Sequence, residues 1–238
     1  MLRELVADLD YYANSEKAAF FPRFFKTEAG QYGEGDKFLG ITVPECRSIA
    51  RKFKHLPRDD IQTLLMSPWH EQRLVALLIL LLQYKKASEM EQRSIYAFYL
   101  KNTPHINNWD LVDLSCRDIV GAYIYNHPEE SITLTKLATS DLLWDRRISI
   151  ISTFYFLMQG DPKPTLTIAE KLLPDKHDLI QKATGWMLRE LGKRIDEVLL
   201  ITFLKRHYRD IPRTTLRYAI ERFPATTRKQ ILSGKFPE

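Results

Sequence analysis

The chain has few glycines, few cysteines and no long apolar segment, and each shortage excludes a class of protein. Only nine of its 238 residues are glycine, which argues against a sheet-and-turn protein because such proteins need many tight turns. The two cysteines, Cys46 and Cys116, form neither a disulfide framework nor a metal or redox motif. The richest apolar run, Leu74 to Leu82, is too short to cross a bilayer.

Signals for export, metal binding and nucleotide binding are also missing. Charged residues from Arg3 to Asp10 interrupt the N-terminal segment, so it lacks the apolar centre of a signal peptide. The six histidines show no metal-ligand spacing. The glycine-rich segment 30–40 is not followed by the lysine and hydroxyl residue of a phosphate-binding loop. We therefore expect a cytoplasmic protein that uses no metal and no cofactor and has no membrane contact.

Helix signals are dense, whereas no sustained period-two alternation appears. Capping boxes stand at Thr42–Glu45 and Ser88–Glu91. These patterns predict an all-α chain of roughly a dozen helices, mostly antiparallel pairs joined by short loops. The expected helices include residues 2–12, 15–26, 59–66, 128–138, 163–173, 178–194, 196–207, 212–223 and 225–232. An apolar helix is expected to open at Ser67-Pro68 and run to Tyr84, and another to run from Trp109 to Tyr125.

Four tryptophans recur at nearly regular intervals. They stand at positions 69, 109, 144 and 186, each in or at the start of an apolar helical run. A period near 40 residues is typical of stacked two-helix repeats of the HEAT type. Equivalent positions of successive repeats line up along one surface of such a solenoid. The spacing therefore predicts one HEAT-like α-solenoid domain over residues 1–238 with a lined groove.

The segment from Asn107 to Asp113 is the strongest candidate for a site. Trp109 and Asp113 are four residues apart and share one helix face, and Asn107 or Asn108 can cap that helix. An aromatic plane beside a carboxylate suits a site that holds a cation. The alternative is a core tryptophan next to a solvated acid, which any amphipathic helix can supply.

Positive charge gathers in the second half of the chain. Residues 1–119 hold 16 basic and 16 acidic residues, whereas residues 120–238 hold 19 and 14. Segment 189–229 alone has 11 basic residues against five acidic ones. This asymmetry points to a polyanionic partner, although a solvated helical surface would give the same count. Arg213 and Arg217, on one helix face, are candidate contacts to a nucleic-acid backbone.

Several segments together carry a family resemblance. Phe38–Pro44, Asn108–Asp113, Leu143–Arg147 and Gln181–Glu190 resemble the AlkD family of alkylpurine DNA glycosylases, and the likeness runs from about residue 15 to 223. The resemblance implies a right-handed solenoid of HEAT-like repeats whose concave face binds duplex DNA. It also implies excision of positively charged N3- and N7-alkylated purines by a protein that we expect to be monomeric.

The resemblance also assigns roles to individual residues. It implies that Asp113 is the catalytic carboxylate, and that Trp109 and Trp186 flank the sugar of the damaged nucleotide. The residues expected to contact the DNA backbone are Arg147 and Arg189, with Arg146, Arg213 and Arg217 as further candidates. The family's second helix carries an aromatic residue, typically tyrosine. Here the matching run is Arg23-Phe24-Phe25-Lys26, which has no hydroxyl group.

These residue types fit the chemistry of a cationic leaving group. An alkylated purine leaves as a neutral base, so no general acid is needed, and positive charge moves to the sugar as in glycoside hydrolysis. A fixed carboxylate stabilises that charge, and each tryptophan face adds about 0.5–2 kcal/mol of cation–π attraction. Two alternatives remain: a non-catalytic HEAT-repeat protein that binds damaged or branched DNA, and a scaffold for an acidic protein partner.

Overall fold

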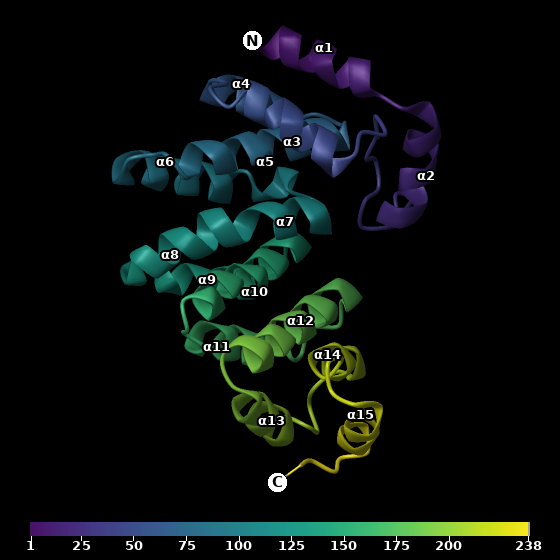
Figure 1. Ribbon diagram of the computed structural model, residues 1–238, viewed down its shortest axis with the longest axis vertical. Helices are drawn as coiled ribbons and strands as arrows, with labels where there is room; N and C mark the ends of the chain where they lie inside the picture. Colours follow the sequence, from purple (N-terminus) through teal and green to yellow (C-terminus); the bar gives the residue numbers. More distant parts are fainter. Residues whose placement is uncertain (238) are drawn as a thin grey trace. The chain divides into compact units, whose positions relative to one another are not determined.

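The computed structural model describes residues 1–237, which form helices joined by loops and confirm the all-α prediction (Figure 1). Contacts divide the chain into two compact units, one from Met1 to Ser115 and one from Cys116 onward. The single continuous solenoid and its right-handed superhelix remain predictions. None of the helices within residues 1–237 is both long and apolar enough to span a membrane.

The first unit is built around one buried helix. Its elements are α1 (Leu2–Tyr12), α2 (Ser15–Phe25), α3 (Val43–Lys52), α4 (Arg58–Leu65), α5 (His70–Tyr84), α6 (Glu89–Lys101), the 3-10 turn η1 (Thr103–His105) and the start of α7 (Trp109–Cys116). Helices α3, α4 and α6 all pack against α5, and every residue from His70 to Leu81 except Gln72 is buried. The nearly all-round apolar surface of this segment explains its central position.

The predicted capping boxes form, but one predicted helix start is displaced. Thr42 with Glu45 and Ser88 with Glu91 cap α3 and α6 as expected. Helix α5, expected to open at Ser67-Pro68, begins at His70 instead. The reason is a short backbone bridge, in which Lys37 N donates to Pro68 O and His70 N donates to Lys37 O. Those bonds keep Trp69 extended, outside the helix.

The second unit stacks helices in successive pairs. Its elements are the π-helical turn η2 (Arg117–Gly121), α8 (Ala122–Asn126), the 3-10 turn η3 (Pro128–Ser131), α9 (Ile132–Ala138), α10 (Leu143–Met158), α11 (Lys163–Leu172), α12 (Asp178–Arg194), α13 (Glu197–Arg206), α14 (Arg213–Ala219) and α15 (Ala225–Leu232). Helix α10 packs on α9, α11 and α12, and α12 packs on α11, α13 and α14. This pairing is compatible with two-helix repeats.

Glycine permits close helix contact at the centre of the second unit. A Cβ atom on Gly185 of α12 would lie 2.5 Å from Thr215 O and 2.5 Å from Tyr218 Cβ of α14. Backbone and Cβ atoms cannot rotate away, so any side chain at residue 185 would push α12 from α14. A Cβ atom on Gly192 of the same helix would come closest to Leu200 Cδ2, at 2.6 Å, which is a side-chain end that can rotate, whereas Leu200 Cβ lies farther away at 3.1 Å.

We therefore expect Gly185→Ala to destabilise the protein by about 1–3 kcal/mol, as overpacked cores do, despite alanine's better helix propensity. Gly192→Ala is the matched control and should change stability much less, because the Leu200 side chain can move. Urea unfolding followed by circular dichroism measures both. Equal midpoints for the two variants would show that the α12–α14 contact does not require glycine.

Candidate functional site

Trp109 and Asp113 lie on α7, as the sequence predicted. Trp109 is the first residue of the helix, and both side chains are half-buried. Asn108 is fully buried just before the helix, and its Oδ1 atom accepts a hydrogen bond of 2.8 Å from Trp109 N. The helix start is therefore fixed at the residue whose indole the resemblance assigns to the site.

The aromatic run of α2 reaches Trp109. The Phe25 ring stacks on the indole with centroids 5.5 Å apart and an interplanar angle of 24°, and Phe24 meets it edge-on at 5.6 Å. Phe24 is 59% exposed. The segment that matches the family's second helix thus supplies an aromatic surface beside Trp109.

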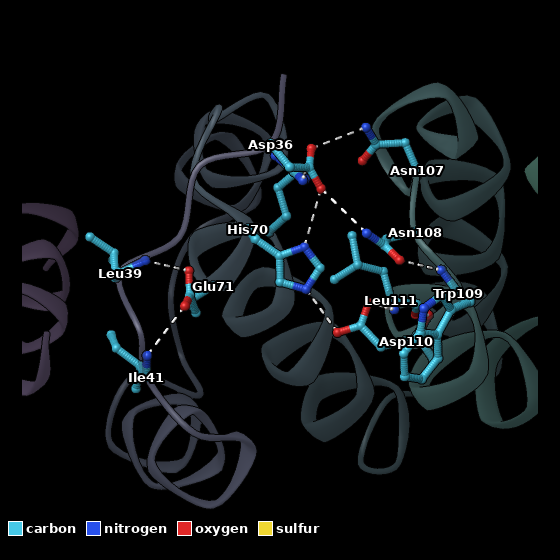
Figure 2. A network of polar contacts seen from close by, with 12 residues as sticks. Asp36, Leu39, Ile41, His70, Glu71, Asn107, Asn108, Trp109, Asp110 and Leu111 are labelled. Carbon is cyan, nitrogen blue, oxygen red and sulfur yellow. Dashed lines mark hydrogen bonds and ion pairs between the residues drawn. The ribbon is translucent and has the colours of Figure 1, made fainter. Parts of the chain in front are cut away.

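A buried charge network lies beside Trp109 (Figure 2). The His70 ring has Nε2 at 2.8 Å from Asp110 Oδ2 and Nδ1 at 3.4 Å from Asp36 Oδ2. Arg73 Nη2 lies 2.7 Å from Asp36 Oδ1. The four side chains are between 3% and 9% exposed. Two cations therefore balance two carboxylates in the interior of the first unit.

Carboxylates beside both ring nitrogens favour a doubly protonated His70. An ionised carboxylate can only accept hydrogen bonds, so both ring nitrogens must donate. Burial by itself would lower the pKa of His70, but the charges and hydrogen bonds of Asp110 and Asp36 outweigh it and raise that pKa to about 9. Burial likewise raises the pKa of Asp36, but the contacts with His70 and Arg73 prevail and hold it below its ordinary value.

Aromatic rings enclose the imidazolium. The centroids of Phe25 and Phe38 lie 4.9 Å and 5.0 Å from that of His70. Phe25 therefore contacts both His70 and Trp109. A cation beside aromatic faces is favoured, so the same phenylalanine contributes to the network and to the surface around Trp109.

A second buried carboxylate fixes the loop that carries Asp36. The Glu71 side chain, on a residue that is 1% exposed, accepts hydrogen bonds from the backbone N–H groups of Leu39, Gly40 and Ile41 at 2.8–3.2 Å. Gly40 has φ +80 and an added Cβ would lie 2.1 Å from Asn14 O. Adjacent residues of α5 thus bind both ends of segment 36–41 (Figure 2).

Sequence reasoning missed this network. Asp110 lies in the first turn of α7, where the helix dipole favours a carboxylate, and its side chain accepts a hydrogen bond from Leu111 N at 2.8 Å. Its main partner, His70, lies 40 residues away. No local spacing in the sequence signals a contact over that distance. Within residues 1–237, no group of His, Cys, Asp and Glu side chains could hold a metal ion.

The other predicted site residues lie in the second unit. Trp186 on α12 is half-buried, 6.2 Å from the Phe154 ring. Arg147 on α10 is buried and donates to Leu179 O at 2.7 Å. Arg189 on α12 pairs with Glu221. Because Trp109 and Asp113 belong to the first unit, the convergence of all these side chains in one groove stays a prediction.

The remaining candidate DNA contacts differ in how they are held. Arg146 pairs with Asp175 at 2.7 Å and donates to two backbone carbonyls, so its guanidinium already braces the start of α10. Arg213 is exposed and donates to Leu232 O at 2.9 Å, and Arg217 is exposed on the same helix, α14. Trp144, in contrast, is 4% exposed and packs in the core.

Comparison with known proteins identifies the family. Over residues 5–223 the sequence matches the family described as DNA alkylation repair enzyme. The chain belongs to this family. A solved structure described as a predicted DNA alkylation repair enzyme from Enterococcus faecalis has a similar fold, with a TM-score of 0.69 and 18% identity, covering 90% of this chain and 97% of that one. Curated proteins yield no match.

Membership of the DNA alkylation repair family confirms the resemblance seen in the sequence. It supports a role as an enzyme in the repair of alkylation damage, with DNA as the partner. The substrate and the chemical step are a separate question, which the residues around Trp109 address.

The network predicts a particular pH dependence of stability. The pKa of His70 is about 9 in the folded protein and about 6.5 in an unfolded chain. Its stabilising effect is therefore complete below pH 6.5 and is lost as the pH rises toward 9, by roughly 3 kcal/mol. Urea midpoints of the wild type measured at intervals between these pH values should fall accordingly.

Two variants isolate the contribution of His70. His70→Gln should be less stable at neutral pH and should lack most of the decline toward pH 9. His55→Gln, at an exposed position outside the network, should keep the wild-type profile. The interpretation fails if His70→Gln declines as steeply as the wild type.

Proposed function

We propose that the protein is a DNA glycosylase that hydrolyses the N-glycosidic bond of cationic N3- or N7-alkylated purines in duplex DNA. The observation that supports it most is the position of Trp109 and Asp113 in the first turns of α7. The start of this helix is held by Asn108 and by the buried Asp110–His70 pair. An indole and a carboxylate on a fixed helix start are suited to a cationic transition state.

In the proposed reaction, Asp113 acts on the sugar. Departure of the neutral purine leaves positive charge at C1′ and the ring oxygen. The Asp113 carboxylate stabilises that charge and orients the water that attacks C1′. Because the leaving base already carries its charge before bond cleavage, no residue has to protonate it.

The aromatic residues contribute by attraction to the same cation. The face of Trp109 adds cation–π stabilisation, and the neighbouring rings of Phe24 and Phe25 restrict the indole's movement. Phe24 stands where the family typically has tyrosine, so any hydrogen bond from that hydroxyl is absent from the proposed mechanism. Trp186 is proposed as the second aromatic face.

Arginines of the second unit are proposed to bind DNA phosphates. Arg147 and Arg189 would flank the damaged nucleotide, and Arg213 and Arg217 on α14 would extend the contact along the backbone. Phosphate contacts of this kind give affinity without base sequence preference. They also make binding weaken as salt increases.

Catalysis by Asp113 predicts a defined effect of one substitution. Asp113→Asn removes the negative charge with little change in shape, and should slow release of 7-methylguanine or 3-methyladenine from methylated duplex DNA by about a hundredfold or more. Duplex binding, measured by fluorescence anisotropy, should stay near that of the wild type. Released bases are quantified by chromatography under single-turnover conditions.

Asp10→Asn is the matched control because Asp10 is exposed at the end of α1, and it should leave release unchanged. Wild-type protein that binds duplex DNA but releases no base would favour the non-catalytic DNA-binding alternative. Wild-type protein that fails to bind even at low salt would favour the scaffold.

The phosphate contacts predict a change in salt dependence. Arg213→Gln and Arg217→Gln should each reduce the slope of log affinity against log salt by about 1, and should weaken binding to every duplex sequence alike. Lys136→Gln, on an exposed part of α9, should leave the slope unchanged. Anisotropy titrations at several salt concentrations give the slopes, and unaltered slopes for both arginine variants would exclude α14 from the interface.

A further inference from the structure

A basic cavity lies within the first unit at the end of α5 far from His70. Its volume is about 560 Å³, and its lining includes Arg51, Lys54, His55, Arg58, Lys86 and Glu91. Residues 70 and 83 are separated by 13 positions of α5, which corresponds to roughly 20 Å along a helix. The cavity is therefore distinct from the surface around Trp109.

The charge of the cavity is not balanced by its own residues. Four of the lining residues are Lys or Arg, and none of them forms an ion pair with another residue in the described range 1–237. Glu91 supplies one negative charge, and its carboxylate is already held by Ser88 N and Ser88 Oγ, each at 2.8 Å. These hydrogen bonds also lower its pKa. The lining thus carries a net positive charge of several units that a bound anion would neutralise.

Arg58 is the most unusual member of the lining. Its guanidinium lies over the Phe98 ring at 4.8 Å, and its Nε and Nη1 atoms are shielded from solvent without a hydrogen-bond partner among residues 1–237. Partial burial lowers the pKa of this side chain. A desolvated cation without a counter-charge is unfavourable, so an anion in the cavity would relieve this cost.

Helix dipoles do not account for Arg58. Arg51 lies in the last turn of α3, where a cation is stabilised by the negative end of the helix dipole. Arg58, in contrast, is the first residue of α4, where the same dipole disfavours a cation. Helix stability therefore does not explain why an arginine occupies this position, whereas binding of a ligand would.

The size and chemistry of the cavity identify the class of ligand. The lining offers two planar guanidinium forks and two ammonium groups, which match a phosphate because it accepts several charge-assisted hydrogen bonds. Small-molecule sites have volumes of about 300–1,000 Å³, and Leu82, Ala87 and Ile95 give this cavity an apolar wall. We propose that the cavity binds a phosphate group, free or carried by a ligand of about a mononucleotide's size.

Calorimetric titration of the full chain with inorganic phosphate, and separately with deoxyadenosine 5′-monophosphate, tests the proposal. We expect saturable one-to-one binding. Equal affinities for phosphate and for the nucleotide would mean that the cavity recognises the free anion, whereas tighter binding of the nucleotide would mean that it is a nucleotide site. Arg58→Met keeps the apolar stem and removes the charge, and should weaken binding about tenfold or more. Lys136→Gln, which removes a distant positive charge, should bind as the wild type does.

A second variant combines Lys54→Gln with Lys86→Gln. Both lysines are exposed, so this variant does not disturb packing, and it should weaken binding to a similar degree. Neither variant should alter the rate of base release from methylated DNA, so this proposal and the glycosylase proposal can fail independently. Absence of saturable binding by the wild type, or equal affinity in all variants, would overturn the phosphate site.

Discussion

The contact on which the rest of the candidate site depends is the placement of His70 between Asp36 and Asp110. Burying four charges costs solvation, and a buried pair is stabilising only when its partners are well matched. Here two cations face two carboxylates, and removal of any one would leave a buried charge uncompensated. The network therefore stabilises the fold while His70 is protonated, and it specifies one arrangement of the loop, α5 and the start of α7.

Charged side chains near the two ends of α5 differ in whether they have counter-charges. At the N-terminal end, Arg73 and His70 are compensated by carboxylates, and aromatic rings lie against His70. At the C-terminal end, Arg58 lies over the Phe98 ring, but neither it nor Lys54 or Lys86 pairs with a carboxylate among residues 1–237. Charges that are compensated within the protein shape the fold, whereas uncompensated ones are available to a ligand. This contrast separates the repair site proposed at α7 from the phosphate site proposed at the other end.

Sequence patterns predicted the helices well because helix signals are local. Capping at Thr42 and Ser88, and the position of Trp109 and Asp113 on one helix, follow from neighbouring residues alone. The predicted start of α5 was wrong because a backbone bridge determines where the helix begins. This bridge joins Trp69 to Lys37, which lies 32 residues earlier. The charge network could not be predicted for the same reason, because it joins a glycine-containing loop, α5 and α7, which lie far apart in the sequence. Long-range pairing of this kind has no spacing rule from which it could be predicted.

The state of the His70 ring tests the central claim most directly. Nitrogen-15 NMR of the imidazole distinguishes a ring with two N–H groups from one with a single N–H. The account predicts that both ring nitrogens carry protons at neutral pH and that the ring loses a proton only near pH 9. A ring with one protonated nitrogen at pH 7.5, titrating near the ordinary value for histidine, would contradict the ionic network and with it the explanation of how the start of α7 is held.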